Sequence, residues 1–485
     1  MEKHALPVAV TGENAKEITR SQWKRSLVEL TGKLESSYRH DVSPLLMESY
    51  SEIGVFPHAY YIDGTRCKTH NRHLHPLLVR NGNEFFSFDF DGATEVGVSG
   101  LEFDKQGMYL ASGTKAGCLT IHKFESLYCQ SNQCVIKKLL EPDPKEEERK
   151  QLLHILLPNS IDNVRWNPTN QNEVACTSYG HSEVHIFNTR YMSSQPTQVL
   201  RKRPTSADFD DTDLGLTDII LSNDSRVFAS DKHGVISIWD RRAGDLPQSG
   251  LTVNSNIRLT SIQVTGDHYV LGASQSGIIH MWDIRDGTSS AALQSHTEVH
   301  SSPWISLELA SMQENELLKA LSKKKIDSIG INPSYPHQLG FHLDNGWSGV
   351  FDMHDFLVTH IHRTPPPWLE EDDYHAHVCY KRKPSWLPDH SIYVVGSASS
   401  NALHLLDFNP STNSPCHLDH DELKERHEPR KQNMLIPLSG HVTACATHPL
   451  NGTIVVGTLR EAALLVISQE QMTWNIEDVD DNDDN

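Results

Sequence analysis

The sequence lacks several features that would place it in a common functional class. Its 485 residues include only eight cysteines, with no CxxC pair, which argues against a disulfide framework and indicates free thiols in a reducing compartment. No run approaches the roughly 18 apolar residues of a membrane helix, and the opening MEKHALPVAVTGENAKE has no apolar signal core. We therefore expect a soluble protein of the nucleus or the cytoplasm.

Catalytic signatures are also missing. The chain contains no glycine-rich phosphate loop, no GxSxG elbow and no HExxH helix, so we expect no enzyme, no catalytic residue and no cofactor. The sharpest metal candidate is the segment CKTHNRHLH, with Cys67, His70, His73 and His75. Thiolate and imidazole suit zinc, but this spacing matches no ligand pattern, and 29 histidines are spread through the chain. We assign no metal site.

The charge is strongly negative. A formal net charge of −20 disfavours direct binding to a phosphate backbone. Short basic clusters at 201–203, 323–325 and 381–383 are either solvated loop charge or parts of a surface for nucleic acid or an acidic protein. The last residues, NIEDVDDNDDN, cannot bury apolar surface and predict a disordered tail, either purely solvating or directed at a basic partner.

Internal repeats dominate the rest of the chain. VFASDKHGVISIWDRR (227–242) and YVLGASQSGIIHMWDIR (269–285) share a strand, a turn ending in Gly234 or Gly277, and a second strand ending in Trp-Asp. Glycine suits such a turn because it adopts positive φ without a Cβ clash. Five more units follow this template, and they begin at Met108, Val174, Gln338, Ile392 and Thr453.

The seven units predict an all-β fold built from seven four-stranded blades. Each unit follows another short alternating strand, and a fourth strand from the next segment completes a blade. Asp240 and Asp283 lie 43 residues apart, within the roughly 40 to 45 expected of such repeats. The other repeats contain polar insertions at 141–150, 201–215, 365–377 and 416–431. Long loops of a propeller lie on its faces or rim, where partners bind.

The ring also needs a strand that completes its last blade. NEFFSFDF (83–90) alternates three phenylalanines on one face, and we assign it as the outer strand of blade seven, which would join the two ends of the repeat region. The alternative is an ordinary strand near a loop. We place the domains at 1–79 for an N-terminal helical extension with a linker, 80–470 for the propeller and 471–485 for the acidic tail.

The units resemble WD repeats. Trp-Asp occurs in two of them and is replaced by other pairs in the rest, and the glycine-histidine pair that opens a WD repeat stands in the expected position only at Gly440-His441, before the last unit. The resemblance covers 80–470 and implies a seven-bladed scaffold that holds protein partners without catalysis of its own.

A narrower resemblance concerns two consecutive WDxR boxes. They are Trp239-Asp240-Arg241-Arg242 and Trp282-Asp283-Ile284-Arg285. They look like the boxes with which substrate receptors of cullin-RING ubiquitin ligases dock on the damage-specific DNA-binding-protein adaptor. The resemblance implies that Arg242 and Arg285 lie on the bottom of the ring, where guanidinium groups would contact the adaptor.

A simpler interpretation of the boxes is structural. Trp239 and Trp282 would pack between blades, Asp240 and Asp283 would cap local backbone groups, and the two arginines would be solvated. WDxR occurs in many propellers that have no role in a ligase.

The N-terminal segment predicts an amphipathic helix between Ile18 and Tyr38. Its apolar positions recur at spacings of three and four residues and are Trp23, Leu27, Leu30, Leu34 and Tyr38. A second short helix at 45–53 would make a helix-loop-helix, which several such receptors insert into the adaptor. Alternatively, the helix packs on its own propeller.

Together these patterns predict a protein-interaction scaffold. Its most concrete form is a ligase substrate receptor that contacts the adaptor through the two boxes together with Trp23, Leu27 and Leu30, and presents a protein substrate elsewhere. The alternative is a structural propeller subunit of a nuclear or cytoplasmic complex that binds histone or other basic tails.

Overall fold

The computed structural model describes most of the repeat region. The described residues are 60–63, 97–128, 151–178, 180–191, 193–202, 215–253, 257–266, 268–285, 299–309, 324–362, 382–398, 400–411, 414–418, 433–438, 440–459 and 464–469. All of them belong to one compact unit, Val55–Gln469. Within this part of the chain, no helix is long and apolar enough to span a bilayer.

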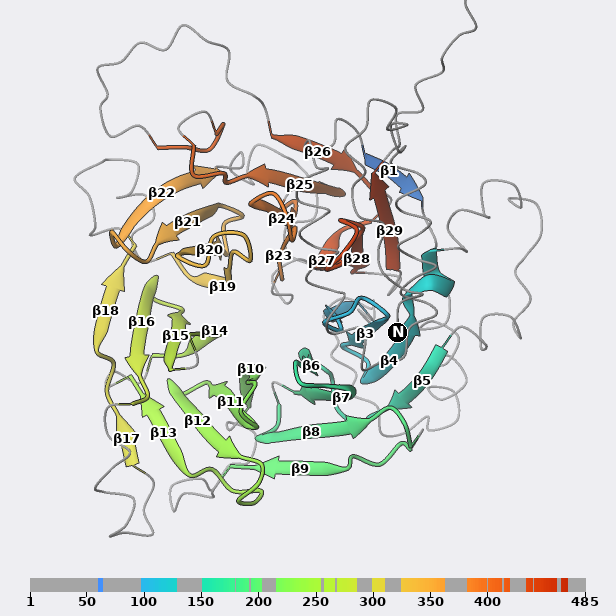
Figure 1. Cartoon of the computed structure of the whole chain (residues 1–485), viewed down its shortest axis with the longest axis vertical. Coiled ribbons are helices and arrows are strands. Elements are labelled where there is room, and N and C mark those ends of the chain that lie inside the picture. Colours follow the sequence, from blue (N-terminus) through green and yellow to red (C-terminus); the bar gives the residue numbers. More distant parts are fainter. Residues whose placement is uncertain are drawn as a thin grey trace, which may run out of the picture. The chain divides into compact units, whose positions relative to one another are not determined.

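Seven antiparallel sheets follow one another along the chain and surround a common axis (Figure 1). Blade one contains β2 (Val98–Phe103), β3 (Tyr109–Thr114), β4 (Cys118–Lys123) and β5 (Gln151–Leu156). Blade two contains β6 (Asn163–Asn167), β7 (Asn170–Thr177), β8 (Glu183–Asn188) and β9 (Gln198–Arg201). Blade three contains β10 (Leu216–Leu221), β11 (Arg226–Asp231), β12 (Val235–Asp240) and β13 (Ser249–Thr252), with β17 (Val299–Ser301) added in parallel at its outer edge.

The remaining blades have the same order of strands. Blade four contains β14 (Leu259–Thr265), β15 (Tyr269–Ser274), β16 (Ile278–Asp283) and β18 (Ile305–Glu308). Blade five contains β19 (Ile326–Ile331), β20 (Gln338–Leu343), β21 (Ser348–Asp352) and β22 (Leu357–His362). Blade six contains β23 (Ser385–Trp386), β24 (Ile392–Gly396), β25 (Ala402–Asp407) and β26 (Met434–Pro437), and blade seven contains β27 (Val442–Thr447), β28 (Ile454–Thr458), β29 (Leu464–Gln469) and β1 (Tyr60–Asp63). One helical turn, 124–128, follows β4.

The seven predicted blades are confirmed, but the strand that closes the ring is not the predicted one. β1 pairs antiparallel with β29, with Tyr60 opposite Gln469 and Asp63 opposite Val466. The assignment of 83–90 to this position was wrong, and 83–90 itself lies outside the described residues. An edge strand is held by backbone hydrogen bonds, so its side-chain pattern says little about which segment takes the position.

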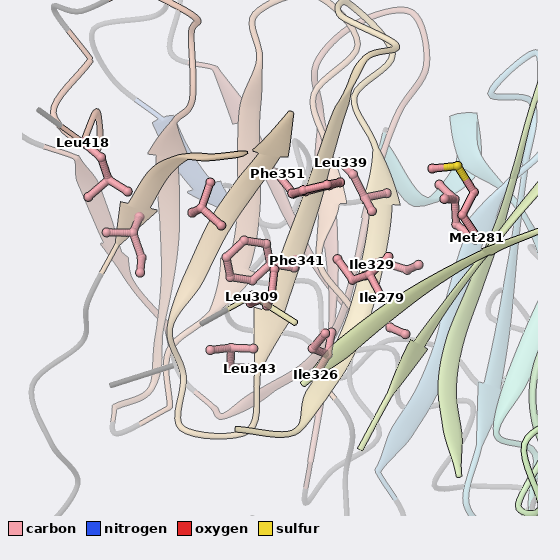
Figure 2. Packing of buried hydrophobic residues seen from close by; sticks show 14 residues of the cluster. Ile279, Met281, Leu309, Ile326, Ile329, Leu339, Phe341, Leu343, Phe351 and Leu418 are labelled. Carbon is pink, nitrogen blue, oxygen red and sulfur yellow. The ribbon is translucent and has the colours of Figure 1, made fainter. Parts of the chain in front are cut away.

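Apolar clusters between neighbouring sheets join the blades. One of them combines Ile279 and Met281 of blade four with Leu339, Phe341 and Leu343 of blade five, all buried (Figure 2). Burying such side chains stabilises the fold by roughly 1.5 to 3 kcal/mol each. The blades therefore stabilise one another across the sheet faces rather than folding as independent units.

Hydrogen bonds between the inner strands add a second set of links around the axis. Asn163 Nδ2 of blade two donates to the carbonyl of Thr217 in blade three at 3.1 Å. The hydroxyl of Thr443 in blade seven donates to the carbonyl of Val98 in blade one, which links the last repeat to the first. These bonds satisfy carbonyl groups of the inner strands, where unpaired polar groups are costly.

The order of strands defines two faces of the propeller. Arg226 at the start of β11 lies opposite Asp240 at the end of β12, and Tyr269 at the start of β15 lies opposite Asp283 at the end of β16. The turns from first to second strands and the connections from third to fourth strands therefore share one face, here called the lower face. The connections between successive blades leave from the opposite, upper face.

Candidate protein-interaction site

The two tryptophans of the WDxR boxes lie between blades. Trp239, the next-to-last residue of β12, is fully buried in a cluster with Ala175, Val184 and Ile186 of blade two. Its Nε1 donates a hydrogen bond to the carbonyl of Arg201 on β9, at 3.2 Å. This ring therefore joins blade three to blade two and offers no surface to a partner.

Trp282 occupies the corresponding place between blades three and four. It is buried in a cluster with Phe228, Ile236 and Ile238 of blade three. A Cβ atom added to Gly272 would lie 2.9 Å from the Trp282 ring, so glycine is needed there to make room for it. Unlike Trp239, Trp282 has no hydrogen-bond acceptor for Nε1 among the described residues.

Each aspartate of the two boxes binds the arginine two residues later. Asp240 Oδ1 accepts hydrogen bonds from the backbone N–H of Arg242 at 3.0 Å and from its Nε at 2.9 Å. The second carboxylate oxygen of Asp240 accepts a bond from Arg242 Nη2 at 2.8 Å. This bidentate arrangement is the strongest geometry for a carboxylate and a guanidinium group. We call this arrangement the Asp–Arg clasp.

Blade four repeats the clasp. Arg285 donates from its backbone N–H to Asp283 Oδ1 at 3.0 Å and from Nη2 to Oδ2 at 2.7 Å. The guanidinium carbon also lies 5.6 Å from the ring centroid of Tyr269, and Nη2 reaches the Tyr269 hydroxyl at 3.3 Å. The side chains of Arg242 and Arg285 are nevertheless 72% and 61% exposed. Both guanidinium groups are thus oriented and accessible on the lower face.

The clasps change the acidity of their carboxyl groups. The hydrogen bond from the Arg242 side chain lowers the pKa of Asp240, and that from Arg285 lowers the pKa of Asp283 to about 2. Both aspartates are therefore charged at neutral pH. Both guanidinium groups keep their charge as well, and each is held in one orientation by its carboxylate.

Arg241 differs from its neighbour Arg242. Its Nη1 pairs with Glu173 of blade two at 2.7 Å, and its Nε donates to Gln198 at 3.0 Å. Arg241 is largely buried by these contacts and links blades two and three. The two adjacent arginines of the first box thus have separate places, one in the interface between blades and one in solvent.

The same turn recurs where the sequence shows no WDxR box. Asn188 at the end of β8 accepts a hydrogen bond from the backbone N–H of Arg190 at 2.9 Å, as Asp240 does from Arg242. Equivalent bonds run from His354 to Asp352 at 2.8 Å and from Asn409 to Asp407 at 3.0 Å. Sequence reasoning missed Arg190, although asparagine carries the Oδ1 atom that this turn requires.

Large exposed apolar residues accompany the three arginines. Tyr191, Leu246 and Trp304 are 72%, 51% and 65% exposed. They lie on the connections from third to fourth strands in blades two, three and four, which also carry Arg190, Arg242 and Arg285. The sequence did not predict these apolar positions.

Other predicted features lie outside the described residues. These are Trp23, Leu27 and Leu30 of the N-terminal helix and Cys67, His70, His73 and His75 of the possible metal segment. Within the described residues, no group of three or more histidine, cysteine, aspartate or glutamate side chains is arranged to hold a metal ion.

The comparisons with known proteins add information on the fold. No family profile and no curated protein matches the chain. Among solved structures, the crystal structure of Raptor from Chaetomium thermophilum superposes with a TM-score of 0.52 at 12% identity, over 78% of this chain and 28% of that chain. The chain is a seven-bladed β-propeller. At this level of identity the likeness concerns the fold alone, and the chain spans little more than a quarter of the Raptor chain.

The propeller fold is typical of protein-interaction scaffolds rather than of enzymes. The geometry of the two WDxR boxes agrees with the structural interpretation and also with docking on a partner. The tryptophans pack between blades and the aspartates accept backbone hydrogen bonds, as the structural interpretation expects. The arginines project from the lower face, as docking on a partner requires.

Proposed function

We propose that this propeller is a non-enzymatic substrate receptor of a cullin-RING ubiquitin ligase in the nucleus or the cytoplasm. It would dock on the damage-specific DNA-binding-protein adaptor through its lower face. The observation that carries the proposal is the pair of exposed Asp–Arg clasps, at Arg242 and Arg285, in the same position of two adjacent blades.

Preorganisation supports a binding role for these arginines. A free arginine side chain loses roughly 0.5 to 1.5 kcal/mol of conformational entropy when a partner immobilises it. In both clasps the carboxylate already holds the guanidinium group before any partner arrives. An exposed ion pair of this kind contributes little to stability, so folding alone gives little reason for it.

The two faces allow a receptor to hold two partners at once. The connections between successive blades leave from the upper face, opposite the face that carries the two clasps. We propose that the substrate binds on this upper face while the adaptor occupies the lower one. The predicted helix with Trp23, Leu27 and Leu30 would add to adaptor binding.

The test is affinity purification of the intact chain beside an Arg242→Ala, Arg285→Ala double variant. Arg201→Ala is the matched control, because Arg201 is 65% exposed and also pairs with a carboxylate, Glu183. Circular dichroism should show that all three proteins are folded. The proposal predicts that the wild type and Arg201→Ala recover the adaptor and that the double variant does not.

A different result would favour the structural-subunit alternative. If the wild type does not recover the adaptor, or if the folded double variant recovers as much as the wild type, docking through the two clasps is wrong. The partners recovered with the wild type would then identify the complex to which the propeller belongs.

A further inference from the structure

We infer that the lower face docks its partner over three blades rather than the two that carry WDxR boxes. This three-blade surface consists of Arg190, Tyr191, Arg242, Leu246, Arg285 and Trp304. The inference rests on the proposed function for the identity of the occupant, the ligase adaptor. It adds blade two and the three apolar residues to the binding surface.

The placement of the exposed apolar residues is the first argument. Only four large hydrophobic side chains among the described residues are exposed, and three of them are on this surface. The fourth, Leu435, lies on β26 of blade six. Isolated exposed apolar residues are ordinary on protein surfaces. Here, however, each one shares a connection with an exposed arginine, in three consecutive blades.

The backbone of these connections is held in place. The N–H of Trp304 donates to the carbonyl of Met281 at 2.8 Å, in line with the pairing of β18 to β16. The N–H of Tyr191 donates to the carbonyl of Asn188 at 3.3 Å, within the turn that also holds Arg190. Trp304 and Tyr191 are therefore exposed on ordered backbone, which reduces the entropy lost when a partner covers them.

Two of the three connections are also held against the neighbouring blade. Gln198 of blade two donates a hydrogen bond to Asp245 of the blade-three connection at 2.9 Å, and the N–H of Arg201 donates to the Asp245 carbonyl at 2.9 Å. On the other side, β17 belongs to the connection between β16 and β18 of blade four, yet it pairs in parallel with β13 of blade three. Figure 1 shows β17 alongside β13 at the rim. These bonds hold the blade-three connection against β9 of blade two and the blade-four connection against β13 of blade three.

The chemistry of the surface fits a folded protein. Tryptophan, tyrosine and arginine are the residue types that dominate binding energy at protein interfaces. Nucleic acid is a poor match, because the chain carries a net charge of −20 and would repel a phosphate backbone. The occupant should offer carbonyl or carboxylate acceptors to the guanidinium groups and apolar hollows to Trp304 and Tyr191.

The experiment measures the affinity of the purified full chain for the purified adaptor by isothermal titration calorimetry. The test variants are Trp304→Ala in blade four and the Arg190→Ala, Tyr191→Ala double variant in blade two. Leu435→Ala is the control, since Leu435 is also an exposed apolar residue, 53% accessible, and lies outside the surface. Circular dichroism and thermal unfolding confirm that each variant is folded.

We expect both test variants to weaken adaptor binding by about tenfold or more, and Leu435→Ala to leave it unchanged. A different result would separate the two proposals. If the double variant Arg242→Ala, Arg285→Ala loses binding but both test variants bind like the wild type, the three-blade surface is wrong and the proposed function stands. If the wild type itself fails to bind the purified adaptor, both proposals fall together.

Discussion

The substitutions Trp239→Phe and Trp282→Phe should differ in their effect on stability, because the two indole N–H groups differ in hydrogen bonding. Trp239 and Trp282 are both buried between blades, and each lies in an apolar cluster. They differ at Nε1, which donates to the Arg201 carbonyl in Trp239 and has no acceptor among the described residues in Trp282. We therefore expect Trp239→Phe to destabilise the propeller more than Trp282→Phe.

The magnitude follows from the terms that differ between the two substitutions. Both remove the same ring atoms, so the cavity cost, about 1 to 3 kcal/mol, is similar. Trp239→Phe also loses a hydrogen bond worth about 1 kcal/mol. Trp282→Phe instead removes a buried N–H group whose lack of a partner costs about 1 to 3 kcal/mol. The free energies of unfolding of the two variants should therefore differ by about 2 kcal/mol or more.

Urea unfolding followed by circular dichroism measures this difference, with the wild type as reference. Fluorescence is less suitable because each substitution removes one of the nine tryptophans. Equal destabilisation of the two variants, or a larger effect of Trp282→Phe, would refute the assignment of the two indole groups.

Three further predictions concern the fold. Gly234→Ala should lower the unfolding temperature by several degrees, because Gly234 has a φ of 82° and its new Cβ would lie 2.5 Å from the Ile257 carbonyl oxygen. Gly266→Ala is the control for backbone strain, because Gly266 has a φ of 58° and the nearest atom to its new Cβ lies at 3.7 Å. Burial lowers the pKa of seven histidines: His122, His280, His342, His360, His362, His404 and His448. Because the unfolded chain protonates its histidines near pH 6.5, the contribution of these neutral side chains to stability should be fully present above that pH. Below it, each histidine should lower the free energy of unfolding by up to about 1.4 kcal/mol for every pH unit, and an unfolding midpoint equal at about pH 7 and about pH 5 would contradict this. Burial also raises the pKa of Cys176 and Cys445 to about 12, so peptide mass spectrometry should find both unmodified after iodoacetamide treatment of the native protein and alkylated in denaturant.

The repeat pattern carried most of the information on the fold. In the two repeats that end in Trp-Asp, the sequence predicted a glycine with positive φ in the turn before the last strand. Gly234 and Gly277 have φ values of 82° and 81°. The two strands predicted to end in Trp-Asp do so, because β12 ends at Asp240 and β16 at Asp283. The closing strand could not be found in this way, because an edge position is filled by backbone pairing, which many segments can make.

The candidate site was only partly accessible from sequence. The WDxR motif identified Arg242 and Arg285. It did not show that the aspartate accepts hydrogen bonds from both the backbone N–H and the guanidinium group of the arginine. Arg190 escaped notice because its turn uses asparagine. The exposure of Tyr191 and Trp304 depends on how the connections lie across neighbouring blades, which short-range sequence patterns do not encode.

The most direct test of the central claim is a cryo-electron microscopy structure of the full chain bound to the ligase adaptor. The account predicts that the adaptor lies against the lower face, in contact with Arg242 and Arg285, and that it reaches Trp304 and Arg190 on the flanking blades. An adaptor bound only to the upper face, or no complex at all between the purified proteins, would contradict it.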